Sequence, residues 1–408
     1  MMDFATSTDP RVQAQLDRLP KASSAGDILT LDRIRELCTR LGNPQQRLPP
    51  VFHVAGTNGK GSTIAWLRAA IEAGGGTVHA FTSPHLVRFN ERIRVSGSLI
   101  EDRDLAPLLE QVIDAGDGLD ASFFEVATAA AFIAFARAPA DATLVEVGLG
   151  GRLDATNIVS PIVTGIAALG IDHAHILGDT LGQIALEKAG IAKAGVPLVV
   201  LDYPPDIDAL IAGHAARTGA PLVRVSRSDG PATLDPAQVA NRALAEAMLA
   251  NQTAVTRFDL AGAAASFAWP ARMQRLTGPL VAGLRVPVTL DGAHNAQGAE
   301  QLAAAVDGLI VLMAGLLANR DPADILAPFA GKVARFIALP ISDHDAHQPA
   351  SLAAVADALF GRDDSLAAAS IEQGFEQLRA LDPRLPVVVI GSLYLAGDIL
   401  RLSGIVPD

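Results

Sequence analysis

The sequence predicts an α/β protein with a parallel sheet in its N-terminal domain and a smaller, Rossmann-like α/β domain at its C-terminal end. Three features of the 408 residues support this fold class. Short apolar runs alternate with amphipathic stretches, a pattern typical of parallel strands joined by helices. The run at 51–55 leads into a loop with three glycines. A second series of strands and helices begins after Gly278-Pro279.

The strands of the first domain are predicted from short apolar runs bounded by turn-forming residues. They cover residues 51–55, 78–82, 143–147, 162–169, 198–201 and 222–225, with a small hairpin at 91–100. Stretches with apolar residues at helical spacing lie between them. These predicted helices cover 30–41, 64–72, 104–115, 124–137, a segment from 180, 205–218 and 235–250.

The second domain repeats the same alternation on a smaller scale. Its strands are predicted at 286–290, 309–314, 333–339 and 387–390, and its helices from 297 and at 323–329, 352–360 and 371–381. The predicted domains are therefore residues 1–277 and 278–408, with the boundary inside the segment 269–284.

Composition and charge exclude several classes of protein. The formal net charge of −12 and the lack of any basic run argue against a nucleic-acid partner. The single cysteine, Cys38, excludes an intramolecular disulfide. The first ten residues carry Asp3 and Asp9 and no apolar run, unlike a signal peptide. No segment approaches the ~18 uninterrupted apolar residues of a membrane span. We therefore expect a cytoplasmic protein that binds neither nucleic acid nor membranes.

The stretch from Val51 to Ser62 predicts a polyphosphate site. A buried strand leads into Gly56-Thr57-Asn58-Gly59-Lys60-Gly61-Ser62, where a helix begins. Glycines let backbone N–H groups approach phosphate oxygens, and the helix dipole favours negative charge there. Lys60 would neutralise the outer phosphates and the Ser62 hydroxyl would ligate magnesium. This loop is shorter than the usual G-x-x-x-x-G-K-[ST] pattern, and the alternative is a chance glycine turn.

A carboxylate stands inside an otherwise apolar strand at Val145-Glu146-Val147. Burying it without a partner would be expensive. The partner is either a structural arginine or a magnesium ion near the carboxyl end of the strand, where phosphate loops also lie. The glycine-rich segment 148–157 then predicts a tight loop that faces a ligand.

Together these motifs resemble the folylpolyglutamate synthase/dihydrofolate synthase family, a folate branch of the Mur ligase superfamily. The matching segments occur in the family's order, cover residues 51–295 densely and continue thinly through Gly391-Ser392-Leu393-Tyr394. They are residues 56–62, 83–86, 124–125, 146–157, 172–173, 187–191 and 291–295.

The resemblance implies an ATP-dependent ligase that joins L-glutamate to dihydropteroate and to folates. In such an enzyme the γ-phosphate of ATP is transferred to a carboxylate, and the amine of glutamate attacks the acyl phosphate. The implied partners are ATP, Mg²⁺ at two sites, L-glutamate, and dihydropteroate or a reduced folate. We expect a P-loop ATPase-type first domain that binds ATP and the pterin, a second domain that binds glutamate, and a monomer.

The resemblance also implies roles for individual residues. The implied catalytic residues are Lys60, His173 and Lys188, of which Lys188 is carbamylated by carbon dioxide once its pKa is lowered. The implied metal ligands are Ser62, Ser83, Glu146 and His173. The implied ATP-binding residues are Thr57, Asn58, Gly59, Lys60, Gly61, Ser62, Asn241, Arg272, Asp291 and His294. The implied substrate-binding residues are Phe124, Leu153, Asp154, Ala155 and Ser392.

Three departures and alternatives accompany this interpretation. Arg272 follows Ala271 where the family pattern has Pro-Gly-Arg, and an acidic-lysine-aspartate signature appears as residues 319–321, Asn-Arg-Asp. The segment 343–347 contains two histidines and two aspartates, for which we favour a solvated loop over a metal site.

Three other functions stay open at this stage. They are a monofunctional member of the same family, a cell-wall Mur ligase, and a non-catalytic nucleotide-binding protein. Mur ligases normally carry a UDP-binding domain before the phosphate loop, whereas only a short helical segment precedes Gly56 here.

Overall fold

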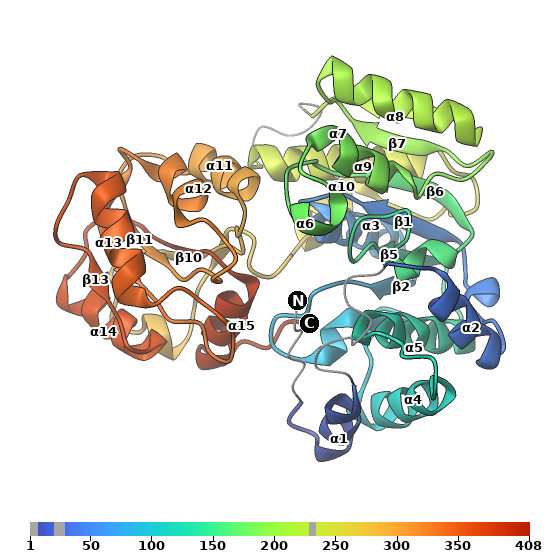
Figure 1. The fold of residues 1–408 in the computed structure, drawn as a ribbon, viewed down its shortest axis with the longest axis horizontal. Coiled ribbons are helices and arrows are strands. Elements are labelled where there is room, and N and C mark those ends of the chain that lie inside the picture. The colour runs from blue at the N-terminus through green and yellow to red at the C-terminus, as the bar shows by residue number, and fades with distance from the viewer. Residues whose placement is uncertain (1–6, 20–28, 228–233) are drawn as a thin grey trace. The chain divides into compact units, whose positions relative to one another are not determined.

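The computed structural model describes residues 7–19, 29–227 and 234–408 and divides the chain into two compact units (Figure 1). Unit 1 extends to Ala268 and includes Asp408, and unit 2 is Trp269–Pro407. The expected division at 277/278 lies later in the chain. The reason is that β9 (Gln274–Arg275) pairs with β10 (Val288–Leu290), so the segment after Ala268 belongs to the second sheet.

The sheet of unit 1 has the strand order β4-β3-β2-β5-β1-β6-β7-β8 among the described residues. The six neighbouring strands β2, β5, β1, β6, β7 and β8 pair in parallel. Strands β3 and β4 add an antiparallel edge beside β2. The strands are β1 (Val51–Ala55), β2 (Val78–Phe81), β3 (Ile93–Val95), β4 (Ser98–Leu99), β5 (Ala142–Glu146), β6 (Pro161–Ile166), β7 (Leu198–Leu201) and β8 (Leu222–Val225). The central strands are buried throughout, as expected for a parallel sheet covered on both faces.

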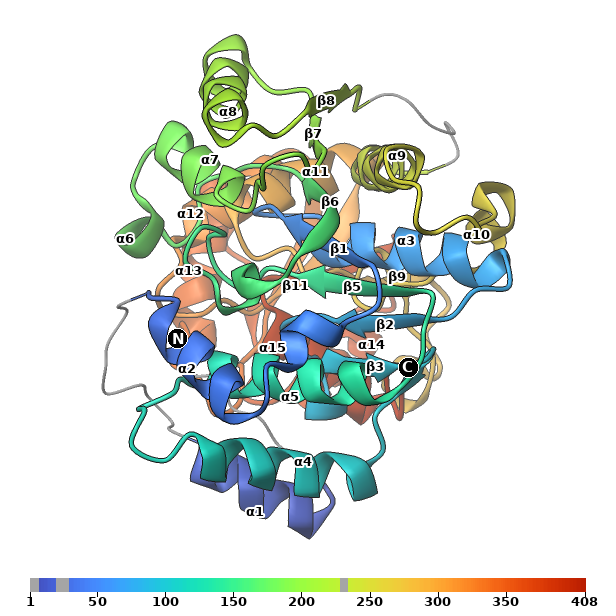
Figure 2. The same cartoon turned by 90° about the vertical axis from the view of Figure 1, so that its right-hand side faces the viewer.

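Helices cover both faces of this sheet. The helices of unit 1 are α1 (Pro10–Arg18), α2 (Asp32–Arg40), α3 (Lys60–Ala73), α4 (Asp102–Ala115), α5 (Phe123–Arg137), α6 (Ala174–Leu177), α7 (Leu181–Ala189), α8 (Pro205–Thr218), α9 (Pro236–Ala250) and α10 (Leu260–Ser266). Helices α3, α9 and α10 share one hydrophobic cluster with β1. Helices α2, α4 and α5 form a second cluster on the opposite face, where Figure 2 shows α5 and α4 below the strands.

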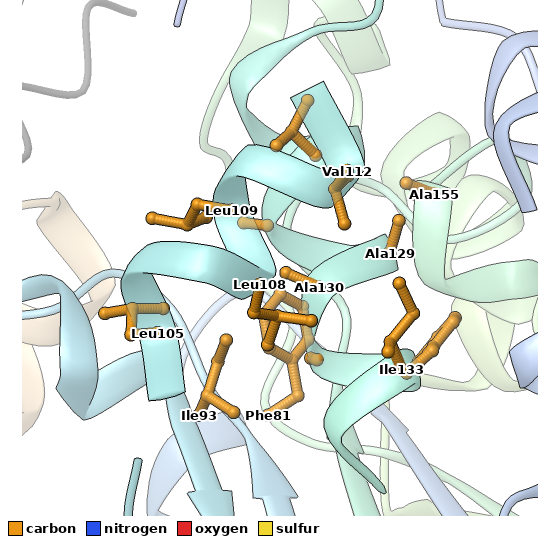
Figure 3. Packing of buried hydrophobic residues seen from close by; sticks show 14 of the residues in the cluster. Phe81, Ile93, Leu105, Leu108, Leu109, Val112, Ala129, Ala130, Ile133 and Ala155 are labelled. Carbon is orange, nitrogen blue, oxygen red and sulfur yellow. The ribbon is translucent and has the colours of Figure 1, made fainter. Parts of the chain in front are cut away.

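The second cluster shows why these helices pack where they do. Leu105, Leu108 and Leu109 of α4 face Ala129 and Ala130 of α5 (Figure 3). The small alanine side chains let the two helices approach closely, and the larger leucines fill the space between them. Helix α5 is therefore held between α4 and the sheet.

Unit 2 contains the sheet β13-β12-β11-β14-β10-β9 among its described strands. In addition to β9 and β10, its strands are β11 (Ile310–Ala314), β12 (Val333–Ala338), β13 (Leu366–Ala367) and β14 (Val387–Ile390). Its helices are α11 (Ala296–Ala305), α12 (Pro322–Leu326), α13 (Pro349–Phe360), α14 (Ile371–Ala380) and α15 (Leu393–Leu402). All pairs except β9–β10 are parallel, so the predicted two-part α/β fold class is confirmed.

Among the described residues, no helix combines the length and the apolar character that crossing a bilayer requires.

Candidate active site

The phosphate loop lies between β1 and α3, as the sequence predicts. Gly59, the residue before α3, has φ +87, a left-handed conformation that favours glycine. A Cβ atom at this position would collide with Asn241 Oδ1 of α9. Helix α9 therefore packs directly on the loop, and the predicted ATP-binding residue Asn241 lies against Gly59.

The amides of the loop do not all point the same way. The N–H groups of Thr57 and Asn58 both donate to Ala168 O, at 2.8 and 3.2 Å, and Thr57 Oγ1 donates to Gly170 O at 2.9 Å. These contacts tie the loop to the segment after β6. The amides of Lys60, Gly61 and Ser62, at the start of α3, lie before the first intrahelical bond, from Thr63 N to Gly59 O, and are the ones suited to an anion.

Two lysine side chains meet at the backbone carbonyl of Gly56. Lys60 Nζ donates to Gly56 O at 3.1 Å and to Thr57 O at 3.3 Å, and Lys188 Nζ donates to Gly56 O at 3.0 Å. Lys188 belongs to α7 and is buried. Burial, and then the positive charge of Lys60, lower the pKa of Lys188 from 10.5 to about 7.

The carboxylate predicted inside a strand is the last residue of β5. Glu146 is buried, and its Oε2 accepts the backbone N–H of Ser83 at 3.0 Å. The adjacent strands β2, β5, β1 and β6 run in parallel, so the residues that follow them lie together at the edge of the sheet formed by the carboxyl ends of the strands. Ser83, Glu146, Ser62 and His173 all lie at this edge.

His173 follows β6 in a left-handed backbone conformation with φ +52. Its backbone N–H donates to Asp172 Oδ1 at 2.8 Å, and its Nε2 lies 3.7 Å from the same oxygen. The imidazole ring therefore lies near the carboxylate of the preceding residue.

The predicted pterin-binding residues surround a close approach between α5 and the loop after β5. A Cβ atom at Gly148 would collide with three ring atoms of Phe124, so the backbone lies directly on the aromatic ring. Asp154 is buried, and its Oδ2 accepts the N–H of Leu149 at 2.8 Å. Leu153 is half-buried beside it and Ala155 is buried. The structure therefore places Leu153, Asp154 and Ala155 in one loop, whose first glycine lies on the Phe124 ring of α5.

In unit 2, three predicted ATP-binding residues lie around one turn. Asp291 accepts the N–H of Met273 through Oδ2 and the N–H of Ala293 through Oδ1, both at 2.9 Å. His294 Nδ1 lies 2.8 Å from Gly292 O, and a Cβ atom at Gly292 would collide with the Arg272 guanidinium.

Ser392 is the N-cap of α15, where its Oγ accepts the N–H of Tyr394 at 3.1 Å. The described residues contain no group of three or more His, Cys, Asp or Glu that could hold a metal ion.

No protein-family model matches the chain. The chain is 36% identical over 311 residues to the dihydrofolate synthase/folylpolyglutamate synthase of Bacillus subtilis, which covers 67% of this chain and 71% of that relative. The structure of E. coli FolC in complex with DHPP and ADP is similar with a TM-score of 0.83 and 27% identity, and the match covers 98% and 99% of the two chains.

A bifunctional folylpolyglutamate synthase/dihydrofolate synthase with Mn, AMPPNP and L-glutamate bound is also similar, with a TM-score of 0.81 and 27% identity over 98% and 99% of the two chains. The identity and coverage of the Bacillus relative decide the family. This chain belongs to the dihydrofolate synthase/folylpolyglutamate synthase family.

One departure of this family member from the expected pattern has a visible backbone consequence. Ala271 replaces the glycine of the expected Pro-Gly-Arg. It adopts φ +52, a region that glycine enters at lower cost. Its carbonyl accepts from Arg272 Nη1 and from Gly292 N, both at 2.8 Å. The conformation expected of a glycine is thus kept, and Arg272 still reaches the turn at Gly292.

Sequence reasoning missed two groups of polar residues in this family member. His53 on β1 lies 2.9 Å from Thr156 Oγ1, and Thr156 Oγ1 donates to Asp154 Oδ1. Gln238 on α9 donates to Ser62 Oγ at 3.2 Å. Both histidine and glutamine stood in stretches that indicated only a strand and a helix, so no local signal could have found them.

Proposed function

We propose that this protein is an ATP-dependent ligase that joins L-glutamate to dihydropteroate and to reduced folates through an acyl-phosphate intermediate. The observation that carries the proposal is the meeting of Lys60 and Lys188 at Gly56, in a chain of this family. The similar structures hold ADP with DHPP, and AMPPNP with Mn and L-glutamate. These ligands belong to the classes that the proposed reaction uses.

The phosphate loop would bind the polyphosphate of ATP. Lys60 would exchange its carbonyl partners for phosphate oxygens and neutralise their charge, which is the main requirement of phosphoryl transfer. Thr57, Asn58 and Asn241 complete the proposed ATP site of unit 1. In unit 2, the residues that we propose to bind the same ATP are Arg272, Asp291 and His294.

The donor set fits magnesium. Hydroxyl and carboxylate oxygens with one imidazole suit Mg²⁺ or Mn²⁺, and the Glu146 carboxylate is buried beside the Ser83 amide. Ser62 and Glu146 would hold one ion, and Ser83, Glu146 and His173 a second. A bound ion would neutralise charge on the phosphates.

The environment of Lys188 fits a carbamylated lysine. Carbon dioxide reacts with the neutral amine, and a pKa of about 7 leaves about half of the amines neutral at pH 7. The carbamate would replace a cation beside Lys60 by an anion. That change would let Lys188 support the metal site instead of repelling it.

The aromatic ring of Phe124 and the loop of Leu153, Asp154 and Ala155 would hold the pterin in unit 1. We assign glutamate binding to unit 2, with Ser392 at the site. We also propose that the enzyme is a monomer.

The proposal is tested by ADP release with L-glutamate and Mg²⁺, with dihydropteroate and tetrahydrofolate compared as acceptors. Lys60→Ala, which should lose turnover, is the control. Activity with both acceptors would establish the bifunctional enzyme, and activity with one would make it monofunctional. Activity with a UDP-linked muropeptide alone would identify a Mur-type ligase, and no turnover with any acceptor would favour a non-catalytic nucleotide-binding protein.

A further inference from the structure

A chain of two hydrogen bonds runs from Trp66 of α3 through Gln238 of α9 to the hydroxyl of Ser62. Trp66 Nε1–H donates to Gln238 Oε1 at 3.2 Å, and Gln238 Nε2 donates to Ser62 Oγ at 3.2 Å. All three side chains are buried, with exposed fractions of 2%, 8% and 2% for Trp66, Gln238 and Ser62. A buried polar chain of this kind fixes the orientation of each member.

The direction of each hydrogen bond follows from the groups involved. An indole N–H can only donate, so it must face the amide oxygen of Gln238. The amide nitrogen then faces Ser62, and because this group also can only donate, Ser62 Oγ is the acceptor. The orientation of the Gln238 amide is therefore set by Trp66.

This arrangement leaves the Ser62 hydroxyl hydrogen and one oxygen lone pair for other partners. Thr63, the next residue of α3, shows the alternative, since its hydroxyl donates back to Gly59 O at 2.9 Å. Such a bond within the helix would turn the hydroxyl away from a ligand. Ser62 Oγ instead accepts a hydrogen bond from Gln238, and its second lone pair is available to a ligand.

The supporting residues are themselves rigid. The Trp66 and Phe267 rings stack with centroids 3.9 Å apart and an interplanar angle of 7°, and the Arg242 guanidinium lies 5.5 Å from the Trp66 ring centroid. Gln238 lies one turn before Asn241 on α9, so one face of this helix supports both Ser62 and the turn at Gly59.

We propose that Gln238, fixed by Trp66, is a positioning residue that aims a lone pair of Ser62 Oγ at the divalent cation of the bound nucleotide. The inference rests on the proposed function, in which Ser62 is a metal ligand. Partners that orient a ligand in this way typically contribute 10–100-fold to metal affinity at stronger sites. A single neutral hydrogen bond corresponds to about fivefold.

The test measures Mn²⁺ binding to the complex of the protein with ADP by electron paramagnetic resonance, and ADP binding without metal by calorimetry. Gln238→Leu should weaken Mn²⁺ binding about fivefold and leave metal-free ADP binding unchanged. The double variant with Ser62→Ala should bind Mn²⁺ no more weakly than Ser62→Ala alone, because Gln238 acts through Ser62. Gln252→Leu is the matched control, since it removes a hydrogen-bonded amide that follows α9.

The outcomes separate the two proposals. If Ser62→Ala weakens Mn²⁺ binding but Gln238→Leu does not, or if the two effects add, the positioning role is wrong and the metal role of Ser62 stands. Equal losses of Mn²⁺ and metal-free ADP binding in Gln238→Leu would also overturn it. If Ser62→Ala binds Mn²⁺ normally, the proposed metal role itself fails. Should Gln238→Leu not fold, Trp66→Phe, which keeps the ring stack, should show a weaker loss in the same direction, and unchanged Mn²⁺ binding there would refute the inference.

Discussion

The low pKa of Lys188 predicts that this lysine destabilises the folded protein at neutral pH. The Nζ atom is buried near Lys60 and donates to Gly56 O. Its folded-state pKa of about 7 lies below the 10.5 of an unperturbed lysine. Between these values the unfolded chain binds more protons than the folded one, so stability should rise as the pH rises from about 7 to 10.5.

The size of this effect follows from the two pKa values. The shifted pKa lowers the free energy of unfolding by about 4 kcal/mol at pH 7, but by only about 1.5 kcal/mol at pH 9.5. Lys188→Met has no amine to titrate. Its free energy of unfolding relative to wild type should therefore fall by about 3 kcal/mol between pH 7 and pH 9.5.

The measurement is urea unfolding of both proteins at the two pH values in buffers free of carbon dioxide. The loss of the hydrogen bond to Gly56 is the same at both pH values and cancels, as do the titrating groups that do not interact with Lys188. A difference between variant and wild type that does not change with pH would refute the reasoning. The same low pKa should give wild-type protein, but not Lys188→Met, a carbamate resonance with ¹³C-bicarbonate.

Two further predictions concern the pterin side of the site. Gly148→Ala should push the Phe124 ring aside and raise the KM for the pterin acceptor about 10-fold or more without changing the KM for ATP, as steady-state kinetics would show. Gly213→Ala on α8 is its control, and equal rises in both KM values would contradict the prediction. Thr156→Val should lower the free energy of unfolding by about 1–3 kcal/mol, because the buried His53 Nε2–H loses its acceptor. Stability within about 0.5 kcal/mol of wild type in urea unfolding would be incompatible with that hydrogen bond.

The order of strands and helices could be predicted because each buried parallel strand is a continuous apolar run. Two of the elements that were not predicted, α1 and β9, lack so clear a signal. Helix α1 is nine residues long with a polar outer face, and its N-terminus is marked only by the Asp9 cap and Pro10. Strand β9 is two residues long and exists only because it pairs with β10. Its pairing also explains why the second unit begins before the expected boundary.

In the candidate site, too, some residues could be predicted from local sequence and others could not. The phosphate loop and its lysine are local in sequence, since a strand, a glycine turn and a helix N-terminus follow one another within twelve residues of the chain. The partners that orient this loop are not local. Gln238 lies 176 residues from Ser62 in the sequence, and His53 lies 103 residues from Thr156. Which way a buried amide or imidazole points depends on the packed fold, so a single sequence carries no pattern for it.

Both units place their candidate residues by the same rule of parallel sheets. In unit 1 the phosphate loop, Glu146, Ser83 and His173 lie at or beyond the carboxyl ends of β1, β5, β2 and β6, which are the central strands. In unit 2 the turn at Asp291 follows β10, and Ser392 follows the neighbouring strand β14. These two segments are joined directly, since Asp291 N donates to Val389 O and Gly391 N donates to Ala293 O, both at 2.9 Å. The proposed nucleotide residues and the proposed glutamate residue of unit 2 therefore lie on one edge of its sheet. A change in the turn at Asp291 should accordingly alter the KM for ATP and the KM for glutamate together, whereas changes in the loop at Asp154 should act on the pterin acceptor.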